Sequence, residues 1–153
     1  MTRIVVGAVT VYVIDMGSTP WRVLTLQRAP TGTRCPGSWE GVHGTIEPDE
    51  SPEDAAVREV REETGLTIQR LYNVTVQPFY LHGQGTVQLA VVFAAVASGA
   101  VTLSEEHQAA EWLPIAEGRR RFSWPHARPA MDQIVEILSA GDAGPLEDVL
   151  RVR

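Results

Sequence analysis

The sequence has no lysine and a single cysteine, and each shortage narrows the possible functions. All 13 basic residues are arginine, and 19 acidic residues outnumber them, which gives a formal net charge of −6. This acidic balance argues against non-specific binding to nucleic-acid polymers, which depends on basic side chains that neutralise phosphates. Arginine alone is compatible with forked phosphate contacts, although genome composition is the simpler explanation. Cys35 has no partner for an internal disulfide.

Long hydrophobic runs are also absent. The apolar run at residues 4–14 follows Arg3 and is too short to span a bilayer. Residues 17–20, Gly-Ser-Thr-Pro, match a signal-peptide cleavage site poorly, so we interpret the run as a buried strand and expect a cytoplasmic protein. With 153 residues, 44% hydrophobic and 21% charged, the chain should form one domain over residues 1–153 with a sizeable core.

Strand-like and helix-like segments alternate along the chain. Met131, Ile134, Val135 and Leu138 repeat at helical spacing before Gly141, which predicts a helix over residues 129–140. Residues 29–38 are rich in turn formers and predict a loop. Strands are expected at residues 4–14, 21–28, 39–42, 67–80, 86–96 and 111–113. This mixture favours an α/β fold with a mixed sheet between helices.

The most informative segment is residues 44–66, GTIEPDESPEDAAVREVREETGL. Ser51 suits a helix N-cap, Pro52 the first helical position and Asp54 the negatively charged first turn. Gly65 suits the end of the helix. One helix is therefore predicted over residues 52–64.

Three carboxylates of this helix share a face. Glu59, Glu62 and Glu63 stand at i, i+3 and i+4, so their charges repel one another and should raise their pKa values. A hard divalent cation relieves this repulsion, and oxygen ligands favour Mg²⁺ or Mn²⁺. Arg58 lies four residues before Glu62 and eight after Glu50, where it could orient carboxylates. The competing interpretation is a solvated acidic face with ordinary ion pairs.

The spacing of Gly44, Glu50, Arg58, Glu59, Glu62, Glu63 and Gly65 decides between these interpretations, because it resembles the Nudix box with no position missing. The resemblance implies the Nudix fold, an α/β/α sandwich, and metal-dependent hydrolysis of diphosphate linkages in nucleotides and related small molecules. It also implies that Gly44, Glu50 and Gly65 are structural, while Arg58, Glu59 and Glu62 serve catalysis and Glu59, Glu62 and Glu63 bind metal.

Residues outside the box extend the resemblance. Arg28 ends a strand whose terminal arginine often contacts substrate phosphate in the family, although a solvent-exposed arginine is an equal alternative. His43 precedes the box glycine, where the family often places a backbone carbonyl on the metal; it could instead pack or carry a proton. Glu106, six residues before Trp112, resembles a family acid that binds metal or orients water, with Glu105 as its competitor.

Within the family, the chain most resembles the pyrophosphohydrolases of dATP and dihydroneopterin triphosphate, through SWEGVHGTIE, EHQAAEWL and FSWPHARPAMDQIVEIL. Pro78 and Tyr80 fall near, but not at, the positions that mark hydrolases of ADP-ribose and dinucleoside polyphosphates. An isopentenyl-diphosphate isomerase would need a cysteine after Trp39, whereas Cys35 precedes it. A non-catalytic nucleotide-sensing domain would usually have lost box glutamates, and all are retained.

The resemblance leaves several points open. We expect water to attack a phosphorus of the diphosphate bridge with the help of metal ions, and Glu59, Glu62 and Glu106 are alternative acceptors of its proton. Neither the nucleobase, the choice of Mg²⁺ or Mn²⁺, nor the number of metal ions follows from the box. The oligomeric state is also open, with a homodimer among the possibilities.

Glu62→Gln tests the metal cluster, because it keeps the side-chain shape and removes one charge. Turnover should fall by roughly 10²-fold or more at saturating Mg²⁺, while the helix stays folded by circular dichroism. Glu53→Gln, on the other side of the helix, is the control and should be nearly silent. Activity of Glu62→Gln within a few-fold of wild type would show that the box is not the catalytic site.

Overall fold

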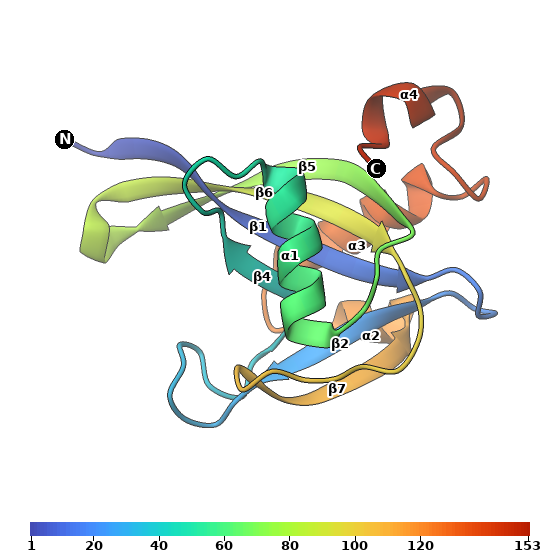
Figure 1. Cartoon of the computed structure of the whole chain (residues 1–153), viewed down its shortest axis with the longest axis horizontal. Helices are drawn as coiled ribbons and strands as arrows, with labels where there is room; N and C mark the ends of the chain where they lie inside the picture. The colour runs from blue at the N-terminus through green and yellow to red at the C-terminus, as the bar shows by residue number, and fades with distance from the viewer.

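The computed structural model describes all residues from 1 to 153, and its secondary structure is a mixture of strands and helices (Figure 1). The strands are β1 (Arg3–Asp15), β2 (Arg22–Arg28), β3 (Trp39–Glu40), β4 (Val42–Thr45), β5 (Arg70–Leu81), β6 (Thr86–Val96) and β7 (His107–Pro114). The helices are α1 (Pro52–Thr64), α2 (Ile115–Arg121), α3 (Ala127–Ile137) and α4 (Glu147–Leu150), with short 3₁₀ turns at His82–Gln84 and Gly144–Leu146.

The seven strands form one mixed sheet. Its main order is β3-β2-β1-β6-β5, with β4 paired to β1 and β7 paired to β2. The β1–β6 pair is parallel and every other pair is antiparallel. Pro78 is tolerated in β5 because this strand lies at the end of the main order, where one edge needs no hydrogen bonds.

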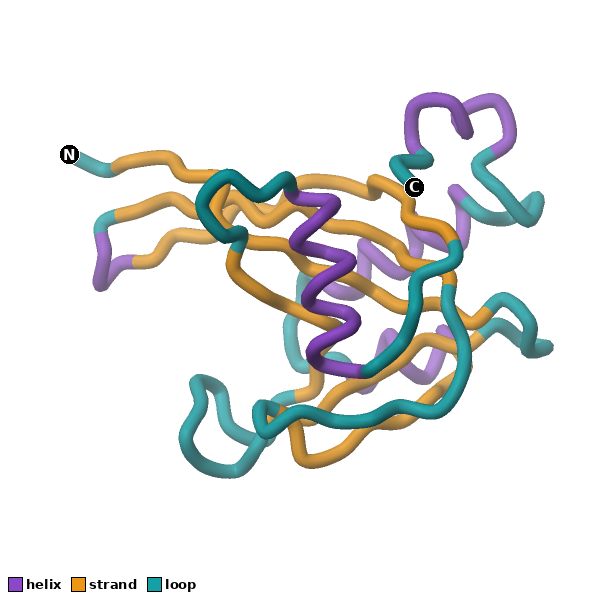
Figure 2. Tube along the Cα trace, viewed as in Figure 1, coloured by secondary structure: helices purple, strands orange, loops and turns teal.

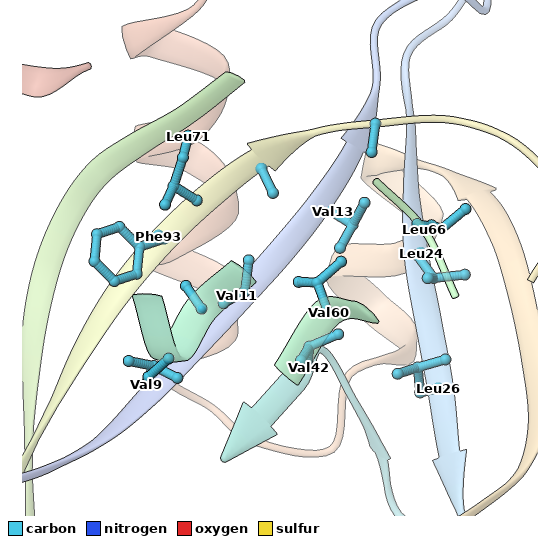
Figure 3. Packing of buried hydrophobic residues seen from close by; sticks show 14 residues of the cluster. Val9, Val11, Val13, Leu24, Leu26, Val42, Val60, Leu66, Leu71 and Phe93 are labelled. Carbon is cyan, nitrogen blue, oxygen red and sulfur yellow. The ribbon is translucent and has the colours of Figure 1, made fainter. Parts of the chain in front are cut away.

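Alternation along β1 separates two buried clusters, one on each face of the sheet. Val9, Val11 and Val13 face α1, where Val60 and its neighbours complete a core of 14 buried residues (Figure 3). Tyr12 and Ile14 of β1 face the opposite side, toward α3. Helix α1 thus covers one face, and α2 and α3 lie behind the other (Figure 1), which confirms the predicted Nudix-type layering of helices around a mixed sheet.

Helix α1 has the predicted bounds. The Ser51 side chain accepts a hydrogen bond from the Asp54 backbone N–H at 3.1 Å, and Pro52 occupies the first turn. Gly65 ends the helix at φ 73°, a left-handed conformation that glycine adopts without steric cost. The local sequence therefore sets both ends of the element that carries the glutamates.

Other predicted bounds need correction. Strand β5 begins at Arg70 rather than residue 67, because residues 65–69 first cross from α1 to the sheet. Strand β7 is longer than the predicted 111–113, since it pairs along all of β2. Helix α3 covers Ala127–Ile137 rather than 129–140; Pro129 falls in its first turn, where a missing N–H costs nothing. The segment 39–42 divides at Gly41 into β3 and β4.

Helices α2 and α4 were not expected from the sequence. Helix α2 has no side-chain cap and contains Gly118, whose missing side chain lets the helix pack directly against Val23 of β2. This helix therefore depends on tertiary packing rather than on local signals. None of the helices combines the length and the apolar character needed to cross a membrane.

Candidate active site

The guanidinium of Arg58 forms hydrogen bonds with the carboxylates of several glutamates of the box. Its Nε and Nη2 donate to the two carboxylate oxygens of Glu50 at 2.8 and 2.9 Å, and its Nη1 donates to Glu59 Oε1 at 2.8 Å. Nη2 also donates to the backbone carbonyl of Thr45 at 2.9 Å, and Nη1 reaches Glu62 Oε2 at 3.3 Å. Because the donors of a guanidinium have a fixed planar geometry, Arg58 orients these carboxylates and lowers the pKa of Glu50 to about 2.

Gly44 has a steric role beside this network. A β-carbon added at Gly44 would overlap the side chain of Glu59. Gly44 pairs with Val9 in the β1–β4 ladder, so its backbone cannot retreat to make room. Only glycine therefore allows the Glu59 carboxylate to lie this close to β4.

A second group of ionisable side chains lies farther along α1. Glu63, Glu106 and His107 each offer a ligand atom, and these atoms all lie within 4.8 Å of one another. The loop 97–106 makes this possible, because it passes the end of α1 and the Thr102 N–H donates to the Thr64 carbonyl at 2.9 Å (Figure 2). This loop carries Glu106 to the helix.

Glu63 is the most perturbed acid of the site. It is only 3% exposed, and its Oε2 is buried without a hydrogen-bond partner. Burial, followed by the neighbouring Glu106, raises the pKa of Glu63 to about 10. Burial also raises the pKa of Glu59, against the opposing effect of Arg58. By contrast, the side chain of Glu62 is 57% exposed.

Glu40 connects this group to Arg28. Arg28 Nη1 donates to Glu40 Oε1 at 2.7 Å, and His107 Nε2 lies 3.5 Å from the same oxygen. Although burial alone would raise it, the pKa of Glu40 is lowered by His107 and Arg28. Arg28 Nε donates to the backbone carbonyl of Arg34 at 2.7 Å, and the guanidinium also contacts the Thr33 hydroxyl. Arg28 is therefore ordered by the protein and is not a free solvent-exposed arginine.

A cavity of about 350 Å³ lies on the face of the sheet opposite α1. Arg28 and Glu40 line it, so it shares these two residues with the network around His107. Its aromatic walls include Phe79 and Trp124, whose ring centroids are 5.7 Å apart at 80°. Its polar side chains include Thr10, Gln77, Gln88, His43 and His126. The lining combines flat apolar surfaces with neutral hydrogen-bonding groups and the charged side chains of Arg28, Arg34 and Glu40.

The imidazole of His43 belongs to this cavity rather than to the group around Glu63. Its Nδ1 lies 3.1 Å from the Thr10 hydroxyl oxygen, across the β1–β4 pair. Although part of the ring faces the open cavity, the surrounding walls exclude enough water to lower the pKa of His43. A ligand role for His43 would therefore fall to its backbone carbonyl.

The donor set suits a hard divalent cation. Several carboxylates crowd together, and one buried carboxylate oxygen has no partner within the protein. Mg²⁺ and Mn²⁺ prefer such oxygen ligands, and a cation would compensate the charge that burial disfavours at Glu63. The residues present therefore fit a metal site.

The structure brings together most of the residues singled out in the sequence and adds several others. Glu50, Arg58, Glu59 and Glu62 form one network, and Glu106, rather than Glu105, belongs to the group with Glu63. The site residues that the sequence analysis did not single out include Glu40, His107, Gln77, Gln88, Phe79, Trp124 and His126. A polar residue inside a buried strand pattern was the only local signal for Glu40.

Comparison with known proteins agrees with this geometry. The NUDIX domain family matches residues 4–134. The chain belongs to the Nudix family. A MutT-like protein of Streptomyces ambofaciens is 32% identical to it over 119 residues, which are 74% of this chain and 68% of that protein. The protein is thus a Nudix hydrolase acting on phosphoric anhydrides, a class that generally uses divalent metal ions.

Solved structures of Nudix proteins share the fold, but these proteins act on or bind different compounds. The E. coli dihydroneopterin triphosphate pyrophosphohydrolase has a TM-score of 0.63 and 24% identity, over 86% of this chain and 94% of its own. The Nudix domain of Shewanella oneidensis NrtR, complexed with ADP ribose, has a TM-score of 0.72 and 18% identity, over 90% of each chain. At these sequence identities the similarity establishes the Nudix fold only, so the substrate has to be inferred from the residues of the site.

The raised pKa of Glu63 predicts a pH-dependent stability of the metal-free protein. Between the ordinary value of 4.5 and about 10, folded Glu63 keeps a proton that the unfolded chain releases. The stability that this proton provides is full below pH 4.5 and is lost as pH rises toward 10. Glu63→Gln mimics the protonated form at every pH. In EDTA, its Tm should therefore gain on that of wild type by about 3 °C or more between about pH 5 and pH 9.

Glu62→Gln is the matched control for this scan, because it alters an exposed carboxylate of the same helix. Its Tm should run parallel to that of wild type across the pH range. A parallel course for Glu63→Gln as well would show that Glu63 ionises as an ordinary carboxyl.

Proposed function

We propose that this Nudix hydrolase is a Mg²⁺-dependent pyrophosphohydrolase that cleaves a nucleoside or pterin triphosphate to a monophosphate and pyrophosphate. The observation that carries the proposal is the position of Glu40 and Arg28. Both line the cavity, and Glu40 also contacts His107 of the group that contains Glu63 and Glu106. A ring bound in the cavity would therefore have its phosphates next to the carboxylates.

The cavity supports a flat heterocycle as the group recognised. Phe79 and Trp124 offer aromatic surfaces for stacking, and Gln77 and Gln88 offer amides that can both donate and accept hydrogen bonds. A volume of about 350 Å³ is at the small end for ligand sites. This size suits one ring system better than the two nucleosides of a dinucleoside polyphosphate.

Five groups are the proposed metal ligands: the carboxylates of Glu59, Glu62, Glu63 and Glu106 and the backbone carbonyl of His43. A bound divalent cation would neutralise the charge of the phosphates and lower the pKa of a water molecule. Arg58 contributes by keeping Glu59 and Glu62 in position, since it donates hydrogen bonds to both. Glu50 fixes Arg58 in turn.

The proposed reaction is the attack of water on one phosphorus of the diphosphate bridge. The water oxygen bonds to phosphorus, the P–O bond to the leaving pyrophosphate breaks, and a glutamate accepts the proton of the water. Glu59, Glu62 and Glu106 are the alternative acceptors. Among these three, the Glu62 side chain is more exposed than that of Glu59, at 57% against 12%, and its contact with Arg58, at 3.3 Å, is longer than that of Glu59, at 2.8 Å.

ADP-ribose is the second candidate substrate, supported by the fold similarity to the NrtR domain that binds it. Isomerase chemistry gains less support, because Cys35 lies in the loop before Trp39 rather than after it. A non-catalytic sensing role is disfavoured by the intact set of box glutamates.

Product identity tests the substrate assignment. With Mg²⁺ present, a panel of dNTPs, NTPs, dihydroneopterin triphosphate, ADP-ribose and dinucleoside polyphosphates should give the fastest turnover with a triphosphate, and chromatography should show a monophosphate and pyrophosphate. Stepwise release of orthophosphate, or a preference for ADP-ribose over every triphosphate, would overturn the assignment. Either result would leave hydrolysis of phosphoric anhydrides intact.

Arg28→Ala tests the proposed contact with the triphosphate. Hydrogen bonds from a charged donor contribute about 1.5–3 kcal/mol, so KM should rise about 10-fold or more, with a smaller change in kcat if the contact is equal in the ground and transition states. The substitution also leaves Glu40 without its ion-pair partner. The double variant Arg28→Ala/Glu40→Gln removes that complication. A KM restored to the wild-type value in the double variant would show that Arg28 only neutralises Glu40.

A further inference from the structure

His107 is a buried histidine whose ring nitrogens are not satisfied by the protein. Its side chain is 1% exposed, and neither Nδ1 nor Nε2 has a hydrogen-bond partner. The nearest charged atom is Glu40 Oε1, 3.5 Å from Nε2, a contact that lacks hydrogen-bond geometry. A buried polar group without a partner is costly, so an unpaired imidazole at this position calls for a functional explanation.

The position of His107 is fixed by the sheet. It is the first residue of β7 and pairs with Arg28, the last residue of β2, after a local irregularity in the register. Glu106 precedes it on the loop that passes the end of α1, and Glu63 projects from that helix. Three elements that are distant in sequence thus bring two carboxylates and an imidazole to one point.

The distances within this group suit a single ion. One ligand atom from each of Glu63, Glu106 and His107 lies within 4.8 Å of the others. Ligand atoms about 2.0–2.2 Å from a common cation are at most about 4.4 Å apart. Side-chain movements that shorten these distances would bring all three into coordination. Glu63 Oε2, like the imidazole, is buried and without a partner.

We propose that His107 supplies a nitrogen ligand to a divalent cation that Glu63 and Glu106 also bind, so that this metal position is not made of oxygen ligands alone. This inference rests on the proposed metal-dependent function, and it adds a residue outside the box to the metal site.

Glu40 and Arg28 give the imidazole the support that a metal-binding histidine needs. A neutral imidazole has one N–H donor and one nitrogen lone pair. Metal-binding histidines generally direct the N–H toward a carboxylate, which leaves the other nitrogen for the metal. Glu40 provides that carboxylate beside Nε2, and Arg28 holds Glu40 through a 2.7 Å ion pair. With its N–H on Nε2, the imidazole would keep the lone pair of Nδ1 for the cation.

A nitrogen ligand changes which cations the site prefers. Mg²⁺ favours oxygen ligands, whereas imidazole suits transition metals. The His107 nitrogen should therefore raise the affinity for Mn²⁺ and Co²⁺ relative to Mg²⁺. Loss of the imidazole should lower the affinity for Mn²⁺ and Co²⁺ much more than that for Mg²⁺.

The direct test is pulsed electron paramagnetic resonance of the Mn²⁺-loaded wild-type protein, which detects a nitrogen bonded to the ion. We expect nitrogen modulation in wild type and in the control His82→Gln, whose histidine lies in the exposed turn between β5 and β6. The modulation should disappear in His107→Gln. By calorimetry, His107→Gln should bind Mn²⁺ about 10-fold or more weakly, with the affinity for Mg²⁺ changed less than about threefold.

Two other variants keep the inference falsifiable. Persistence of the nitrogen signal in His107→Gln, together with its loss in His43→Gln, would assign the nitrogen to His43 and overturn the proposal. If the wild-type protein gives no nitrogen signal, the proposal for His107 is overturned. If Glu62→Gln also weakens Mn²⁺ binding, that result leaves metal-dependent hydrolysis standing. Failure of wild type to bind Mn²⁺ or Mg²⁺ at millimolar concentration would overturn both. If His107→Gln does not fold, the wild-type and His43→Gln spectra still test the proposal. A nitrogen signal retained in His43→Gln would support it, and a signal lost in that variant would overturn it.

Discussion

The site depends on the guanidinium of Arg58, which converts repulsion between neighbouring carboxylates into a defined arrangement. Glu50, Glu59 and Glu62 would separate if they were left to their charges, and Arg58 donates to all three and to the backbone of β4. The last contact links the helix to the sheet. The glutamates are thereby positioned before any cation arrives, so less ordering has to accompany binding.

The second constraint is the group of buried polar side chains around Glu63, farther along α1. Glu40 is shared between Arg28 and His107, and Glu63 lies nearby with an unpaired oxygen. This arrangement is unfavourable for the metal-free fold, because it buries more carboxylate than the protein itself compensates. Unfavourable burial of this kind is typical of functional sites, where a ligand or ion supplies the missing partner of the polar group. The group also connects the carboxylates to the cavity on the other face of the sheet, because Glu40 and Arg28 line that cavity.

The elements that were predicted well have strong local signals. The bounds of α1 follow from Ser51, Pro52 and Gly65, and most of β6 is the apolar run at residues 89–96. Helix α2 and the full length of β7 depend on partners distant in the chain. Helix α2 exists because Gly118 packs on Val23, and β7 continues to His107 because β2 offers a partner along its whole length. Local propensity contains no information about such partners.

The sequence by itself determined the family, the helix with its glutamates and the arginine that orients them, because these residues are neighbours on one helix and their spacing fixes their common face. It also pointed to Glu106 through its spacing to Trp112. Only the tertiary structure decided that Glu106 meets Glu63, that His43 turns its ring into the cavity, and that Glu40 lies between Arg28 and His107. These contacts join residues up to 67 positions apart, from Glu40 to His107. They arise from strand order and loop path, which the chain specifies only when it packs as a whole.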